Sequence, residues 1–334
     1  MKENNQEIIG VKNLTKKFKK FTAVDSIDFS VKKGEVFAFL GPNGAGKTTT
    51  IRMLTTLLPQ TSGKIEVNGL DPVKEQNKVR ASFGIVFQDF SLDNELTALE
   101  NLRFHSALYS VPKKLSEERI EYMLKLVDLW DRKDNFVKTF SGGMKRRLEI
   151  ARGLLHEPEI LFLDEPTLGL DPQTRNKLWG YIQKLNEDNG LTIILTTHYM
   201  EEADKLSDRI AIIDKGTIIT LDTPDNLKKE LGGDIVTIET QKSEMFEQLL
   251  KKEAWCKSVK RHNHSVTINV KDAGKIISEI IKLAHNNNLI IDSANIHKPS
   301  LEDVFLYFTG KTIREQEADS KDAMRNRMKM WRKR

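Results

Sequence analysis

The residues best suited to chemistry form one glycine-rich segment, residues 41–48, which reads Gly-Pro-Asn-Gly-Ala-Gly-Lys-Thr. Glycine tolerates positive φ angles, so successive backbone N–H groups can point into one concavity and hold phosphate oxygens. A helix that follows adds the partial positive charge of its N-terminus at the same place. Lys47 would then reach the β and γ phosphates of a nucleoside triphosphate, and the Thr48 hydroxyl would bind Mg²⁺.

The flanking segments give this loop the context that phosphate binding requires. Residues 36–40 are a short apolar run after Gly34, which predicts a buried strand. Residues 49–58 can form a helix that ends before Pro59. A plain glycine turn can match the spacing by chance, but strand, loop and helix together predict a P-loop. The predicted phosphate-binding residues are Gly41, Pro42, Asn43, Gly44, Ala45, Gly46, Lys47, Thr48 and Thr49.

Two acidic residues, Asp164 and Glu165, come directly after four apolar residues, 160–163. A continuous apolar run predicts a strand buried on both faces, as in a parallel sheet. Carboxylates at the carboxyl end of such a strand lie where α/β proteins bind ligands. Asp164 can hold the Mg²⁺ that bridges the phosphates, and Glu165 can polarise a water for in-line attack. Acids that simply end a strand are disfavoured here, because an upstream P-loop needs a metal ligand.

A second possible anion site precedes the predicted helix 144–155. Ser141 can cap this helix, and Gly142 and Gly143 leave its N-terminal N–H groups accessible. By itself, this pattern is more often a plain helix cap.

Three further residues lie at the ends of predicted strands or between them. Phe18 lies in a polar connection and could stack on an adenine ring, although a loop phenylalanine is more often a packing residue. Gln88 directly follows the predicted strand 83–87. His198 follows the predicted strand 191–195 and could touch a γ-phosphate or the attacking water, although a lone histidine is more often structural.

The pattern of elements around these residues predicts an α/β P-loop NTPase core with an antiparallel β subdomain and a helical subdomain. Residues 7–33 alternate in the manner of two antiparallel strands. Residues 97–131 are helical in pattern, with Pro112 separating two helices and Ser116 opening the second. The other predicted core elements are strand 64–67, helix 74–80, helix 174–187 and a hairpin of strands 210–213 and 217–221.

A second domain is predicted to begin at Pro224. Its elements follow the order β-α-β-β-α-β, which is that of a small α+β ferredoxin-like domain. They are residues 235–240, 243–252, 254–261, 265–270, 273–286 and 289–297, followed by a short helix 301–308 that Ser300 caps. We therefore expect an ATP-binding domain over 1–222 with a helical subdomain at about 89–158, an accessory domain over 223–310, and a tail over 311–334.

Composition narrows the functional classes. The chain has 334 residues and one cysteine, so it has no internal disulfide, and no apolar stretch approaches the ~18 residues of a membrane span. We therefore expect that it cannot form a pore by itself. The net charge of +5 resides in residues 311–334, where nine Lys and Arg oppose four Asp and Glu. A basic tail is weak evidence for nucleic-acid binding by the body of the protein.

Taken in order along residues 7–221, these motifs resemble the nucleotide-binding subunit of an ATP-binding cassette (ABC) transporter. The resemblance implies that Phe18 stacks on adenine, that Gln88 senses Mg²⁺ and water and reports to a membrane partner, and that Asp164 holds Mg²⁺ together with Thr48 and Gln88. It implies that Glu165 is the general base, His198 the switch histidine, and Asp171 a residue that crosses a dimer interface. One departure is Met144, where the family usually has glutamine; since Ser141, Gly142 and Gly143 are intact, we expect activity to survive.

The resemblance also implies partners and a location. In this family a second copy of the chain faces the first, and each Ser141–Gly143 segment binds the γ-phosphate of ATP held by the opposite P-loop. ATP and Mg²⁺ are the cofactors, and the dimer lies on the cytoplasmic face of the membrane, against an integral membrane permease. Residues 299–305 are similar to the C-terminal region of daunorubicin-resistance-type drug exporters. This implies efflux of a drug, lipid or other hydrophobic compound, and multidrug resistance.

Two other functions remain as alternatives. A soluble ABC ATPase acting on ribosomes or DNA would carry two cassettes or a long coiled coil between P-loop and signature, whereas this chain has one cassette and fewer than 100 residues in that interval. A non-catalytic nucleotide-binding regulator is opposed by the intact Glu165 and His198. The basic tail would lie near the anionic leaflet or the permease, or it would be a solvated disordered segment.

Overall fold

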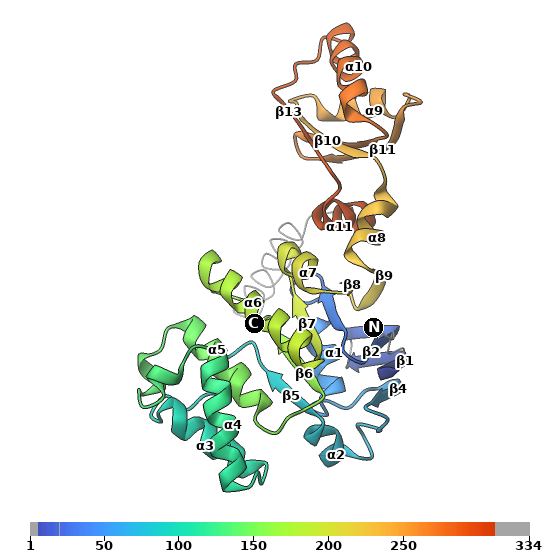
Figure 1. Ribbon diagram of the computed structural model, residues 1–334. Coiled ribbons are helices and arrows are strands. Elements are labelled where there is room, and N and C mark those ends of the chain that lie inside the picture. The colour runs from blue at the N-terminus through green and yellow to red at the C-terminus, as the bar shows by residue number, and fades with distance from the viewer. Residues whose placement is uncertain (1–5, 20, 311–334) are drawn as a thin grey trace, which may run out of the picture. The chain divides into compact units, whose positions relative to one another are not determined.

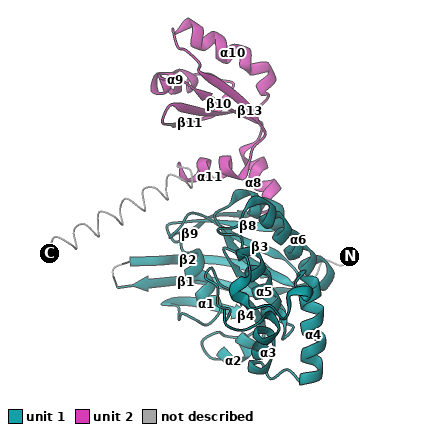
Figure 2. Ribbon diagram, turned by 90° about the vertical axis from the view of Figure 1, so that its left-hand side faces the viewer, with its two compact units in different colours: residues 1–221 teal, residues 222–334 magenta. Residues whose placement is uncertain are grey.

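The computed structural model describes residues 6–19 and 21–310, which fall into two units that divide between residues 221 and 222 (Figures 1 and 2). The basic tail at 311–334 lies outside the described residues. Within them, no helix combines the length and the apolar composition that crossing a membrane requires.

A six-stranded sheet forms the centre of the first unit. Its strand order is β5-β6-β7-β3-β8-β9, and the first five of these strands pair in parallel. Every residue of β3 and β6 is buried, because the sheet is covered on both faces. The α/β core predicted from the apolar runs is therefore confirmed. The strands are β3 (Val36–Leu40), β5 (Phe83–Val86), β6 (Ile160–Asp164), β7 (Thr192–Thr197), β8 (Arg209–Asp214) and β9 (Thr217–Asp222).

A three-stranded antiparallel sheet, in the order β2-β1-β4, shares a core with the central sheet. The predicted antiparallel pair is present, because β1 (Glu7–Phe18) and β2 (Phe21–Lys32) pair along most of their length. Phe29 of β2 packs against Phe37 and Phe39 of β3, with ring centroids 5.6 and 5.1 Å apart. The antiparallel sheet is thereby fixed beside the strand that leads into the P-loop. Its third strand is β4 (Ser62–Val67), and the short helix α2 (Gln76–Ala81) follows.

Helix α1 (Lys47–Leu54) follows the P-loop but ends four residues before the predicted boundary. Thr56 adopts a left-handed φ of 62°, and the N–H groups of Leu57 and Leu58 both donate to the carbonyl of Arg52. The chain therefore turns before Pro59 is reached. Two other helices cover the core, α6 (Pro172–Asn189) and α7 (Met200–Leu206), of which α7 was not predicted.

The helical subdomain consists of α3 (Ala98–Leu108), α4 (Lys113–Leu126) and α5 (Gly142–Leu154), which lie together in Figure 1. The prediction that Ser116 opens the second helix was wrong. Pro112 occupies the cap position, and its carbonyl accepts the Ser116 N–H inside the first turn. Pro112 precedes the first helical residue, Lys113, so the N–H that proline lacks costs the helix no intrahelical hydrogen bond.

The second unit has the predicted ferredoxin-like strand order. Its antiparallel sheet has the spatial order β11-β12-β10-β13. The two central strands, β10 and β12, are the first and third of this unit along the chain. One helix was missed, α8 (Pro224–Leu231), because Pro224 was interpreted as a boundary alone. Thr223 caps this helix and Pro224 is its first residue, a position that proline favours. The other elements are β10 (Asp234–Glu239), α9 (Ser243–Leu250), β11 (Cys256–His262), β12 (Ser265–Val270), α10 (Ala273–Asn286), β13 (Ser293–His297) and α11 (Leu301–Thr309).

Candidate functional site

Lys47 is the centre of the P-loop and is almost completely buried. Its ammonium donates to the carbonyl oxygens of Gly41 and Pro42, at 2.7 and 3.1 Å, and lies 3.1 Å from a Glu165 carboxylate oxygen. The loop approaches β8 so closely that a Cβ on Gly41 would lie 2.1 Å from the Ile213 carbonyl oxygen. Glycine is therefore required at this position by contact with the neighbouring strand.

Two hydroxyl groups converge on Asp164 at the carboxyl end of β6. Thr48 Oγ1 donates to Asp164 Oδ1 at 2.9 Å, and Thr196 Oγ1 donates to the same oxygen at 2.6 Å. A hydroxyl and a carboxylate are the oxygen donors that Mg²⁺ prefers, and this ion usually takes its other ligands from phosphates and water. The pair Thr48 and Asp164 therefore fits the predicted metal.

Glu165 lies between two basic side chains. One carboxylate oxygen faces Lys47, and the other lies 2.6 Å from His198 Nδ1. Burial alone would raise the pKa of Glu165, but the hydrogen bond with His198 and the charge of Lys47 outweigh it and hold the pKa below its ordinary value. The carboxylate is therefore ionised at neutral pH, as a general base must be.

The predicted second anion site lies at the start of α5. Ser141 caps the helix, because its Oγ accepts the Met144 N–H at 3.3 Å. A Cβ on Gly143 would lie 2.3 Å from Thr174 Cγ2, so the starts of α5 and α6 are in close contact. Asp171 caps α6 by accepting the Thr174 N–H and hydroxyl, at 3.0 and 2.6 Å, and these bonds lower its pKa. Thr174 therefore contacts both Gly143 and Asp171, which brings the Ser141–Gly143 segment and Asp171 close together.

The structure thus places the predicted residues in two groups. Direct contacts join Lys47, Thr48, Asp164, Glu165 and His198 at the carboxyl edge of the central sheet. The group around Ser141 lies at the N-termini of α5 and α6.

Two of the predicted residues lie at strand ends. Phe18 is 44% exposed at the end of β1, with Lys16 Nζ 5.1 Å from its ring centroid. Gln88 is exposed just after β5, and its carbonyl accepts a bond from Arg146 at 2.8 Å. An exposed ring and an exposed amide are available to a ligand.

Three residues of this region were not predicted from the sequence. Thr196 holds Asp164, and its Oγ1 also accepts the Glu165 N–H at 3.1 Å. Glu202 is fully buried and accepts bonds from Thr167 and Trp179 behind the site. Arg146 contacts the segment that contains Gln88. The sequence could have indicated Thr196, because it lies two residues before His198. It could not have indicated Glu202 or Arg146, because their partners are distant in sequence.

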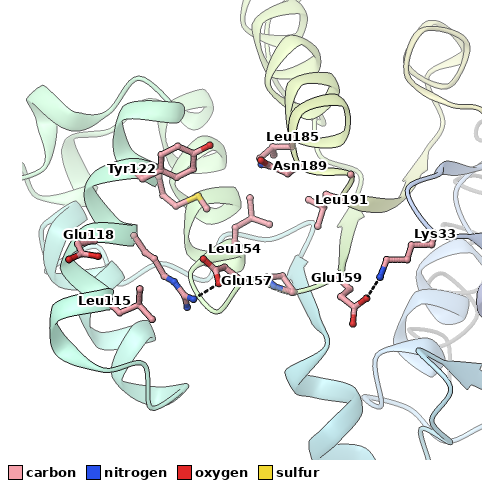
Figure 3. Close-up of a pocket in the computed structure, with 14 residues that line it drawn as sticks. Lys33, Leu115, Glu118, Tyr122, Leu154, Glu157, Glu159, Leu185, Asn189 and Leu191 are labelled. Atoms are coloured by element: carbon pink, nitrogen blue, oxygen red, sulfur yellow. Dashed lines mark hydrogen bonds and ion pairs between the residues drawn. The ribbon is translucent and has the colours of Figure 1, made fainter. Parts of the chain in front are cut away.

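A cavity of about 580 Å³ lies elsewhere in the first unit, between α4 and the end of α6 (Figure 3). Glu159 and Leu191, which line it, precede β6 and β7, so it lies at the amino edge of the sheet, opposite Asp164. None of the predicted phosphate-binding residues lines it. Its apolar side chains, which include Leu115, Tyr122 and Leu154, do not suit a triphosphate.

Comparison with known proteins identifies the family. A family model described as "ABC transporter" matches residues 24–168, and one described as "ATP-binding protein DrrA1-3-like, C-terminal domain" matches residues 223–309. The chain is 40% identical over 312 residues to the linearmycin resistance ATP-binding protein LnrL of Bacillus subtilis, which covers 92% of this chain and 100% of that protein. The chain belongs to the ATP-binding proteins of ABC transporters.

Other relatives agree with this membership. The chain is 37% identical to the daunorubicin resistance ATP-binding protein DrrA3 of Streptomyces coeruleorubidus, over 93% of this chain and 98% of that one. Among solved structures, the ATP-binding cassette MJ0796 in a dimeric post-hydrolysis state with ADP and Pi is 29% identical. It has a TM-score of 0.59 and covers 64% of this chain and 98% of its own. The resemblance and the fold class predicted from sequence are confirmed, and the chain is an ATP-binding ATPase of the ABC class.

Proposed function

We propose that this ABC ATPase works as a homodimer that closes around two Mg²⁺-ATP and drives export through a separate integral membrane permease. The dimer would lie on the cytoplasmic face of the membrane. The observation that carries this proposal is the separation of one phosphate-binding apparatus into two groups of residues on the same chain. Each group is half of a site, so two chains facing head to tail would complete two sites.

In each site, the chain's own residues would divide the chemistry as follows. The backbone of the P-loop and Lys47 hold the β and γ phosphates, and Phe18 stacks on the adenine. Glu165 accepts a proton from the attacking water, and His198 and Lys47 keep its carboxylate ionised and oriented. Thr48 and Asp164, with Gln88, would hold Mg²⁺, which supplies charge neutralisation on the phosphates when bound.

The partner chain would supply the remaining contacts. Ser141, Gly142 and Gly143 present the N-terminus of α5, a position at which anions are stabilised. Asp171 accepts a hydrogen bond from Thr174, the residue that packs against Gly143, and would contact the facing chain. Met144 contributes its backbone N–H to the Ser141 cap, so its side chain is not needed there. One solved relative, the cassette MJ0796, is described as dimeric in two structures, which supports this arrangement.

Export of a hydrophobic compound is supported by relatives that match both units. LnrL and DrrA3 are named for resistance to linearmycin and daunorubicin and align with more than nine-tenths of this chain. A related protein of Ralstonia nicotianae is named a Nod factor export ATP-binding protein and is 34% identical over 92% of this chain. Since these alignments include the accessory unit, we favour an exporter subunit over a soluble ATPase acting on ribosomes or DNA.

The test is reconstitution with a membrane partner. The chain would be co-expressed with a candidate six-helix membrane permease and purified through a tag on that protein. We expect the chain to co-purify, to hydrolyse ATP, and to lower the accumulation of daunorubicin in cells that express both. A chain that hydrolyses ATP but associates with no membrane protein, and leaves drug accumulation unchanged, would contradict the exporter proposal.

A further inference from the structure

Arg146 is buried in the helical subdomain and connects α5 to the segment that contains Gln88. Its side chain is only 2% exposed. One guanidinium nitrogen donates to the Phe87 carbonyl and to Glu149, and the other donates to the Gln88 carbonyl at 2.8 Å. The guanidinium also lies 4.9 Å from the Phe90 ring centroid. A single side chain thus holds three residues of the five-residue segment 87–91, here called the Gln88 segment.

Two more residues on the same face of α5 hold the end of this segment. Glu149 is fully buried and accepts the N–H and hydroxyl of Ser91, at 2.7 and 3.1 Å. Arg152 donates to the Ser91 carbonyl at 2.9 Å and to its hydroxyl at 2.6 Å. Residues spaced by three along a helix share a face. The Gln88 segment is therefore attached to α5 through a buried, charge-assisted network.

The chemistry of this network explains why arginine is needed at position 146. A guanidinium is a planar fork that can reach two carbonyls and a carboxylate at once, whereas a lysine ammonium is a single point of charge. Buried hydrogen-bonded charges also hold their geometry firmly, because every lost bond leaves a desolvated group unpaired. The Gln88 segment and α5 should therefore move as one body.

The two ends of this body serve different ATP molecules in the proposed dimer. Gln88 would contact Mg²⁺ at the site formed by its own P-loop. Ser141 begins the same helix, five residues before Arg146, and would contact the ATP held by the partner chain. We propose that Arg146 is a positioning residue that couples the two ATP sites, so that occupation of one site moves the signature that completes the other. This inference rests on the proposed homodimer.

The variant Arg146→Lys tests the coupling. In the wild type, the Hill coefficient for ATP hydrolysis should lie clearly above 1, with about 2 as its limit for two sites. In Arg146→Lys we expect the Hill coefficient to fall to about 1 while ATP binding to the P-loop is retained, because the sites then act independently.

The matched control is Arg119→Lys. Arg119 also donates to a main-chain carbonyl, that of Leu155, and pairs with a carboxylate, Glu157, but does so at the far end of α5. We expect it to keep the wild-type coefficient.

A double-mutant cycle separates positioning from a general loss of stability. If Arg146 acts through the Gln88 segment, Arg146→Lys should reduce kcat much less in a Gln88→Ala background than in the wild type. If Arg146→Lys does not fold, the variant Arg146→Gln/Glu149→Gln removes both charges of the buried ion pair and replaces them with two neutral amides. It should show the same loss of cooperativity.

Other outcomes would overturn the inference. If the wild-type dimer hydrolyses ATP with a Hill coefficient of 1, its two sites are not coupled and Arg146 cannot couple them. If the Hill coefficient is unchanged in Arg146→Lys, the coupling does not depend on Arg146. Additive effects of Arg146→Lys and Gln88→Ala also contradict it. A wild-type chain that neither dimerises nor hydrolyses ATP contradicts the proposed homodimer instead, so the two failures are distinguishable.

Discussion

The Lys47 ammonium lies 3.1 Å from the Glu165 carboxylate, and both side chains are almost fully buried. The cation that would bind phosphate and the anion that would accept a proton thus balance each other's charge inside the site. Since transfer of either charge to the interior is costly unless it is paired, removal of one partner should change how the other behaves.

Glu165→Gln removes the base and retains its shape. Hydrolysis should fall by at least about 10²-fold, because an amide cannot accept the proton. ATP affinity should hold or rise, because Lys47 loses its carboxylate partner and one negative charge near the phosphates disappears. The trapped protein should be a dimer by light scattering in ATP. A monomeric variant with full phosphate release would refute the role of Glu165.

Lys47→Ala removes the cation and should abolish ATP binding, measured with a fluorescent ATP analogue. The matched control is Lys33→Ala. Lys33 also pairs with a carboxylate, Glu159, at 2.6 Å, but lies at the amino edge of the sheet beside the cavity (Figure 3). We expect Lys33→Ala to leave nucleotide affinity unchanged. Equal affinities of the two variants would count against the P-loop assignment.

The sequence predicted those features whose signals are local. The apolar runs before Gly41 and Asp164 identify β3 and β6, because a strand buried on both faces has a short, continuous apolar sequence. Element ends were less predictable. Pro224 begins a helix rather than separating domains alone, and Ser116 lies inside a helix whose cap is Pro112. Proline and serine each fit two positions, and packing decides between them.

The contacts that build the site depend on distant parts of the chain. Arg146 reaches the Phe87 and Gln88 carbonyls, which are 59 and 58 residues away in sequence. Glu202 reaches Thr167 and Trp179, 35 and 23 residues away. Periodicity reports which face of a helix is buried but not which group meets it there. These residues therefore required the fold before they could be recognised.

Gly143→Ala should destabilise the first unit through one contact. The added Cβ would lie 2.3 Å from Thr174 Cγ2, whereas a Cβ on Gly142 would meet no atom closer than 3.5 Å. We expect Gly143→Ala to cost about 1–3 kcal/mol in urea unfolding, as overpacking usually does, and Gly142→Ala to cost less.

A second substitution separates packing from phosphate binding at Gly143. Thr174→Ser removes the obstructing methyl group and keeps the hydroxyl that donates to Asp171. The double variant Gly143→Ala/Thr174→Ser should therefore regain stability. Hydrolysis should stay low in it, because the added Cβ still occupies the space proposed for the partner's γ-phosphate. Full recovery of hydrolysis would show that Gly143 is needed for packing alone.

Glu202 should make stability depend on pH in a direction opposite to that of a paired carboxylate. Burial is the largest influence and raises its pKa above the ordinary value of 4.5, despite bonds from Thr197, Trp179 and Thr167. The folded protein therefore keeps a proton that the unfolded chain releases as pH rises through 4.5. Wild-type stability is accordingly lost as pH rises from 4.5 toward the folded pKa.

The isosteric variant Glu202→Gln cannot titrate and still accepts bonds from Thr167 and Trp179. In urea unfolding at a series of pH values, we expect its stability to match that of the wild type below pH 4.5 and to exceed it increasingly above, by at most ~1.4 kcal/mol per pH unit. Glu202→Ala should instead destabilise at every pH, by about 1–3 kcal/mol for each buried donor left unpaired. Identical pH profiles for wild type and Glu202→Gln would show that Glu202 is ionised in the folded protein, and that its pKa is not raised by burial.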